Sequence, residues 1–230
     1  MARTVITVDG LAGTGKTTLS ELLASKLGYA CLSSGALYRA IGYLALQQGV
    51  NLDDGGAVAK QVRSHSIELH RDQAGNVSVL LDGSDIGDLI RSPEVSEATS
   101  KTSRHAEVRD LILDLQRNAF HAENLVAEGR DMGTVVFPDA ACKFFIEVDQ
   151  DVRIERRMAQ LAKESPSSFE KAMTDKAQIG KEILERDQRD RTRSVAPCVP
   201  ANDAIFIDNS GSSLDQQLDQ MLSAVRAKVV

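Results

Sequence analysis

A glycine-rich stretch near the amino terminus limits the possible folds of this 230-residue chain more than any other part. Gly10–Thr17, GLAGTGKT, matches the pattern G-x-x-x-x-G-K-[ST]. The β-branched run Thr4–Asp9 precedes it, and Leu19, Leu22, Leu23 and Leu27 follow at helical spacing, with Gly28 as a C-cap. A strand, a glycine loop and a helix in this order are typical of a phosphate-binding loop.

The residue types in this loop suit a nucleoside triphosphate. Glycines allow backbone conformations that turn successive N–H groups toward phosphate oxygens, and the helix N-terminus adds its positive dipole end. Lys16 is predicted to bridge the β and γ phosphates, and the Thr17 hydroxyl to reach Mg²⁺. A chance match in a glycine-rich turn is the alternative, which the flanking strand and helix disfavour.

Strands and helices alternate along the rest of the chain, which predicts a three-layer α/β fold around a central parallel sheet. The expected strands after the first are 29–32, 125–127, 143–148 and 204–208. The expected helices are 36–48, most of 93–121, 151–162, a charged stretch reaching about 187, and 214–228.

The stretch from about 51 to 93 has a different character, with a hairpin expected from 66–70 and 77–81. We interpret it as an inserted, acceptor-side subdomain within one domain that spans 1–230. The core is then 1–50 and 94–230, and a helical lid covers about 156–193.

Charge favours a small anionic ligand over a polyanion. The formal net charge is -6, which argues against binding nucleic acid, whereas Arg186, Arg189, Arg191 and Arg193 form a local basic cluster. The three cysteines show no metal or disulfide spacing, and the chain shows neither a signal peptide nor a membrane-spanning run. A cytoplasmic protein that does not bind membranes is expected.

The loop alone does not distinguish kinases, GTPases and motor ATPases. No guanine-reading N-K-x-D motif is present, and 146–149 and 126–128 fit poorly as the carboxylate strand of a motor. A small-molecule kinase needs a second anion site and a basic lid. Ser33–Arg39, Gly129–Thr134 and Arg186–Arg193 meet these needs. Taken singly, Arg39 also suits an exposed surface, and the basic run suits a solvated helix face.

These segments carry a family resemblance. The motifs G-x-x-G-x-G-K, S-G-A-L-Y-R, G-R-D-M-G-T-V-V-F-P-D-A and R-D-x-R-D-R-x-R-x-V-A-P occur in this order and closely resemble the bacterial cytidylate kinases over nearly the whole chain. The resemblance implies a monomeric kinase that transfers the γ-phosphoryl group of ATP to CMP and dCMP with Mg²⁺.

The same resemblance implies residue roles. The ATP phosphates are bound by Gly10, Leu11, Ala12, Gly13, Thr14, Gly15, Lys16, Thr17 and Thr18. The acceptor phosphate is held by Ser34, Arg39 and Arg130, and cytosine is read by Ser100, Arg109 and Asp131. Arg186 and Asp190 approach the sugar, and Arg189 and Arg193 reach the phosphates when the lid closes. Lys16, Arg130, Arg189 and Arg193 are then electrostatic catalysts without a covalent nucleophile.

The chain departs from the family pattern in four places. Leu11-Ala12 replaces Pro-Ser, Ser33 stands where Asp is common, Thr17 replaces Gly or Ser, and the lid arm at 165–180 is longer. These departures leave the balance between CMP and dCMP open. Two other functions also stay open at this point: a P-loop kinase for UMP, AMP or another metabolite, and a nucleotide-dependent binding module without transfer activity.

Overall fold

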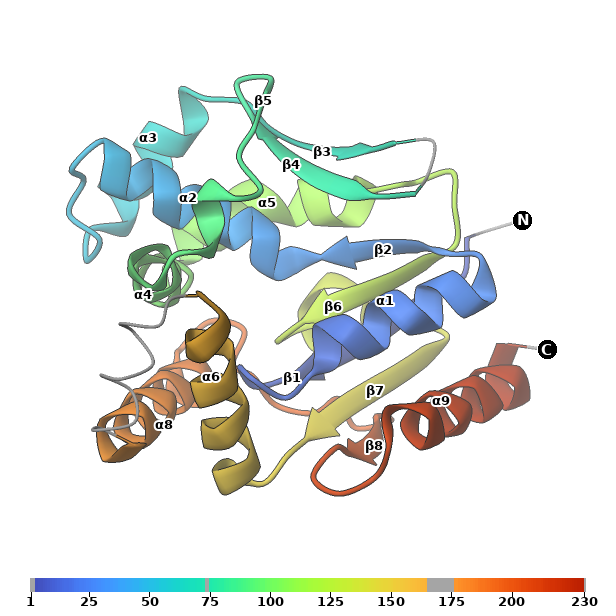
Figure 1. Cartoon of the computed structure of the whole chain (residues 1–230). Coiled ribbons are helices and arrows are strands. Elements are labelled where there is room, and N and C mark those ends of the chain that lie inside the picture. Colours follow the sequence, from blue (N-terminus) through green and yellow to red (C-terminus); the bar gives the residue numbers. More distant parts are fainter. Residues whose placement is uncertain (1–2, 73–74, 165–175, 230) are drawn as a thin grey trace.

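The centre of the protein is a parallel five-stranded sheet in the order β2-β6-β1-β7-β8 (Figure 1). The computed structural model describes residues 3–72, 75–164 and 176–229. The strands of this sheet are β1 (Val5–Gly10), β2 (Ala30–Ser33), β6 (Leu125–Gly129), β7 (Cys142–Glu147) and β8 (Ile205–Asp208). All five predicted strands are present, with ends that differ by at most two residues.

Helices cover both faces of the sheet and complete the three layers. On one face, α1 (Lys16–Leu27) and α9 (Leu214–Val229) pack together and against β6 and β7. On the other face lie α2 (Ser34–Gln47), α3 (Gly55–Arg63) and α5 (Ala106–Asn118). The predicted α/β fold class is therefore confirmed. Within the described residues, each helix is too short or too polar to span a bilayer.

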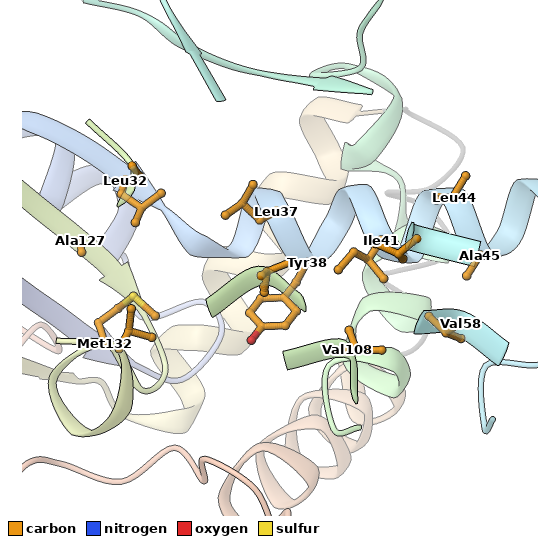
Figure 2. Packing of buried hydrophobic residues seen from close by; sticks show 14 of the residues in the cluster. Leu32, Leu37, Tyr38, Ile41, Leu44, Ala45, Val58, Val108, Ala127 and Met132 are labelled. Carbon is orange, nitrogen blue, oxygen red and sulfur yellow. The ribbon is translucent and has the colours of Figure 1, made fainter. Parts of the chain in front are cut away.

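The larger apolar cluster holds the second face together (Figure 2). Leu32 and Ala127 of the sheet, Ile41 of α2 and Val108 of α5 are each fully buried in it. Met132, which follows β6, belongs to the same cluster. The segment after β6 is thus anchored in the core immediately beside the residues predicted to bind the acceptor.

The 51–93 region contains a helix that the sequence patterns did not predict. Helix α3 begins with two glycines, which are poor helix formers. The Asp54 carboxylate compensates by accepting a hydrogen bond from the Ala57 amide at 2.9 Å, and Val58 and Val62 enter the core cluster. The sequence patterns indicated only a hairpin in this region, so helix α3 was missed.

The predicted hairpin is present, and a short third strand joins it. Strands β3 (Ile67–Arg71), β4 (Val77–Leu81) and β5 (Ser84–Asp85) form a separate antiparallel sheet. A 3₁₀ turn, η1 (Leu89–Arg91), leads into α4 (Pro93–Thr102). The Ser92 hydroxyl accepts from the Val95 amide at 3.3 Å and caps this helix.

Two charged helices lie beyond the carboxyl ends of the parallel strands (Figure 1). They are α6 (Gln150–Glu164) and α8 (Lys176–Thr192), which pack against each other through Ile154 and Ile179. Helix α8 also touches α4. Most of the longer lid arm predicted at 165–180 lies outside the described residues.

Parallel register decides which residues meet at this edge of the sheet. Asp9 pairs with Gly129, and Ser33 pairs with Glu128. These residues, the phosphate loop after β1 and the Arg130–Asp131 pair after β6 therefore lie at the carboxyl ends of neighbouring strands, where α/β proteins bind their ligands.

Candidate active site

Hydrogen bonds within the chain fix the shape of the phosphate loop. The Thr14 hydroxyl and the Lys16 ammonium group donate to the Leu11 carbonyl at 3.0 and 3.2 Å. Asn209, after β8, donates from Nδ2 to the Thr14 carbonyl at 2.7 Å. With the carbonyl groups engaged in this way, the loop amides stay available for anionic oxygens.

Two positions in the loop require glycine, because neighbouring atoms occupy the space that a Cβ atom would need. A Cβ atom on Gly10 would lie 2.6 Å from the Ile146 carbonyl oxygen of β7. A Cβ atom on Gly15, whose φ is 80°, would lie 2.6 Å from Asn209 Nδ2. The first glycine lets the loop leave the sheet, and the second begins α1 in the left-handed conformation.

Lys16 faces an acidic partner from the neighbouring strand. Its Nζ atom lies 3.9 Å from Glu128 Oε2, and the other oxygen of Glu128 accepts a hydrogen bond from the Ser33 hydroxyl. Burial and, to a smaller degree, Arg130 lower the pKa of Lys16 to about 8, against the opposing effect of Glu128. A bound polyphosphate would favour the ammonium form.

Three arginines from different elements form a cationic cluster beside this lysine. They are Arg39 of α2, Arg130 after β6 and Arg186 of α8. Arg39 and Arg186 both donate to the Ser96 hydroxyl, at 3.1 and 3.2 Å. Burial, with smaller contributions from Arg130 and Arg39, lowers the pKa of Arg186 to about 10. Burial also lowers the pKa of Arg39.

The cluster carries more positive than negative charge. Arg130 Nε donates to Asp190 at 3.0 Å, and Arg186 Nε is buried without a hydrogen-bond partner among the described residues. Burial favours the neutral form of Asp190, but Arg130, Arg186 and Arg193 together hold its pKa below the ordinary value. Cationic donors gathered around one carboxylate suit a multiply charged anion.

A second set of polar side chains lies deeper, around Asp131. This carboxylate is 2% exposed, accepts from Arg109 and lies 3.6 Å from Arg193. The Arg109 guanidinium lies 5.2 Å from the centre of the Tyr38 ring. The Ser100 hydroxyl of α4 is buried with no hydrogen-bond partner in the described part of the chain. Side chains that can still make further hydrogen bonds suit a ligand with a polar ring system.

Helix α8, which belongs to the predicted lid and is called the lid helix below, is held to both sides of the site. Arg189 of α8 donates to Glu97 of α4 through two bonds, at 2.7 and 2.8 Å. Arg153 of α6 donates to Asp187 of α8 at 2.5 and 2.8 Å and to the Ala12 carbonyl of the phosphate loop at 2.9 Å. Arg153 thus connects the loop directly to the lid.

The structure brings most of the predicted residues together. Arg39 and Arg186 share Ser96, and Arg130 pairs with Asp190. Arg130 and Arg186 both lower the pKa of Lys16, and Ser34 is buried at the start of α2. Ser100, Arg109, Asp131 and Arg193 form the adjoining set. Thr17 and Thr18 are exposed in the first turn of α1. Arg189 pairs with Glu97 of α4.

Several residues at the site escaped the sequence patterns. Asn209, Arg153 and Glu97 lie far along the chain from their partners, so no local motif marks them. Glu128 ends an apolar strand but was set aside as a poor carboxylate-strand match. Asp9 was treated only as the last residue of the first strand.

A phosphate loop after the first strand of a parallel sheet, a facing cationic cluster and a basic lid helix define a class. The chain is a P-loop kinase, an enzyme that transfers a phosphoryl group from a nucleoside triphosphate to a small acceptor.

Comparisons with known proteins give the family. A family model described as cytidylate kinase matches residues 6–227. The chain is 43% identical over 222 residues to "Cytidylate kinase 1" of Haemophilus influenzae, covering 96% of this chain and 93% of that protein. It is 42% identical over 226 residues to a cytidylate kinase of Mannheimia succiniciproducens, covering 98% and 97%. The chain belongs to the cytidylate kinase family, and the resemblance seen in its motifs is confirmed.

Proposed function

We propose that the protein phosphorylates CMP and dCMP with ATP, by direct transfer of the γ-phosphoryl group in the presence of Mg²⁺. The observation that carries the proposal is the pair of adjoining polar sets beside the phosphate loop. One is cationic and suits a phosphate group; the other contains Ser100, Arg109 and Asp131 and suits a base. The names of the relatives in this family favour cytosine as that base.

The acceptor phosphate is assigned to Ser34, Arg39 and Arg130. Ser34 begins α2, so backbone donors of a helix N-terminus accompany its hydroxyl. The second phosphate pKa of an alkyl phosphate is about 6, so the acceptor is already mostly a dianion at neutral pH. No strong general base is needed, and the main barrier is the repulsion between two anions.

Cytosine is assigned to the set around Asp131. A carboxylate can accept from the exocyclic N4 amine, and a guanidinium can donate to the N3 and O2 acceptors. Arg109 pairs with Asp131, which supports assigning both groups to one ligand. The sugar is assigned to Arg186 and Asp190, and its contacts there would leave room for the deoxy form.

Transfer itself is assigned to electrostatic groups. Lys16 and the loop amides hold the β and γ phosphates, and arginines on both sides stabilise charge on the transferred group. We expect Arg193 and Arg189 to turn toward the phosphates when ATP is bound, Arg189 by leaving Glu97. Closure of α8 would then exclude water from the transferred group.

Mg²⁺ suits the oxygen donors present. The Thr17 hydroxyl is exposed in the first turn of α1, and oxygen ligands with retained waters are what Mg²⁺ prefers. Among the described residues, no three acidic, histidine or cysteine side chains form a metal-holding group, which agrees with an ion carried mainly by the ATP phosphates. When bound, the ion neutralises charge on the β and γ oxygens. The proposal further includes a cytoplasmic monomer acting in pyrimidine nucleotide metabolism, on the strength of the family.

The test is ADP formation from ATP and Mg²⁺ with CMP, dCMP, UMP, AMP and shikimate as separate acceptors. Rapid turnover with CMP and dCMP and weak turnover with the others is the expected result. Preference for another acceptor would retain the kinase and refute the base-reading set. ATP binding without turnover of any acceptor would instead favour a nucleotide-dependent binding module.

A further inference from the structure

Asp9 is a buried carboxylate to which none of the roles above is assigned. It is 4% exposed and stands at the end of β1, one residue before the phosphate loop. Its hydrogen bonds go to the segment after β6, outside that loop. The two carboxylate oxygens accept hydrogen bonds from the backbone amides of Met132 and Gly133, at 2.9 and 2.8 Å.

These two amides begin a single π-helical turn, η2 (Met132–Val136). Amides at the start of a helix lack intrahelical acceptors, and a carboxylate satisfies them well. The Asp131 carbonyl closes the same turn, because it accepts from the Val135 and Val136 amides at 2.9 and 3.2 Å. The turn therefore begins directly at the Arg130–Asp131 pair.

The other side of the turn is anchored by packing. The Met132 side chain is 0% exposed and lies in the core cluster with Leu32 and Ala127 (Figure 2). Gly133 approaches β1 so closely that a Cβ atom would lie 2.8 Å from the Thr7 hydroxyl. A buried side chain, a close backbone contact and the Asp9 carboxylate together leave the turn little freedom.

We propose that Asp9 is a positioning residue for the acceptor nucleotide: by holding the Met132 and Gly133 amides it sets the direction of the Arg130 and Asp131 side chains. This inference rests on the proposed function, because it assumes that those two side chains bind the acceptor. Two neighbouring groups at the end of β1 then have different roles. The backbone after Asp9 binds ATP, and the Asp9 side chain positions the residues that bind the acceptor.

The distinguishing variant is Asp9→Asn, which keeps the shape of the side chain. An asparagine has one acceptor oxygen, and its NH₂ group would face a second backbone N–H, so one of the two bonds is lost. Isothermal titration with CMP and, separately, with ATP then measures each site. We expect the Kd for CMP to rise about 10-fold or more, as for loss of a bond to a charged group, and that for ATP to change less than about threefold.

A second variant moves the partner and leaves Asp9 intact. Gly133→Ala forces the turn away from Thr7 and Asp9, and it should reproduce the selective loss of CMP affinity. Glu123→Gln is the matched control, because this carboxylate pairs with Arg71 of β3 and lies before β6, at the opposite end of that strand from the turn. It should leave both affinities unchanged.

The outcomes distinguish failure of the positioning role from failure of the proposed function. If wild type binds CMP and both variants bind it equally well, Asp9 has no positioning role. If the variants lose ATP affinity as much as CMP affinity, Asp9 merely supports the phosphate loop, and the proposal is overturned. If wild-type protein does not bind CMP at all, the proposed function fails, and the positioning role fails with it.

Discussion

Replacement of Asp131 by asparagine is the sharpest test of base recognition. The carboxylate is 2% exposed and lies between Arg109 and Arg193. Asparagine preserves its volume and removes its charge. The bond from the cytosine N4 amine then changes from a charge-assisted bond to a neutral one, and the Arg109 guanidinium loses its ionic partner in a buried site.

The size of the effect follows from these contacts. A hydrogen bond to a charged group contributes about 1.5–3 kcal/mol, against about 1 kcal/mol for a neutral bond. The difference of about 0.5–2 kcal/mol corresponds to a roughly 2- to 30-fold lower kcat/KM for CMP, and the unpaired Arg109 guanidinium adds to this loss. ATP does not contact Asp131 in the proposed arrangement, so its KM should stay within about twofold.

Steady-state ADP release, with CMP varied at saturating ATP and then the reverse, measures both values. Asp53→Asn is the control, because Asp53 also pairs with an arginine, Arg104 at 2.5 Å, but is 68% exposed. Exposed pairs contribute about 0–1 kcal/mol at most, so this variant should behave as wild type. An equal rise in both KM values for Asp131→Asn, or none, would refute the base-reading assignment.

The remaining predictions concern transfer, lid attachment and pH. Lys16→Ala should lower kcat by about 10²–10³-fold, as for loss of one preorganised donor, while circular dichroism stays unchanged; near-normal turnover would contradict the assignment. Arg153→Ala leaves Asp187 buried without its partner and should lower the urea-unfolding free energy by about 3–5 kcal/mol; a loss below about 1 kcal/mol would mean that the pair is solvated. Burial raises the pKa of Asp9 from 3.8 to about 7, so the native state binds this proton more tightly than the unfolded state. Relative to Asp9→Asn, wild type should therefore gain stability as pH falls from 8 toward 4, by up to about 4 kcal/mol at about 1.4 kcal/mol per pKa unit; parallel urea-unfolding curves across this range would show that Asp9 titrates normally.

Local patterns were sufficient for the parts of the site that lie within one segment. The phosphate loop combines its glycines, its lysine and the following helix in a short stretch, so spacing alone predicts its geometry. The same holds for the start of α2 at Ser34 and for the basic face of α8. Helix α3 was missed because its two leading glycines disfavour a helix locally, and the Asp54 cap and the burial of Val58 outweigh them.

The contacts that join these segments belong to the tertiary structure. Asp9 and Met132 are 123 residues apart, and Arg189 and Glu97 are 92 apart. No local propensity relates such pairs. Parallel strand order and register place Asp9 beside Gly129, and the packing of α8 on α4 places Arg189 beside Glu97. The sequence by itself thus determined which groups could bind phosphate and base. Only the folded chain decided which of them face one another, because their distances depend on strand pairing and helix packing across the whole molecule.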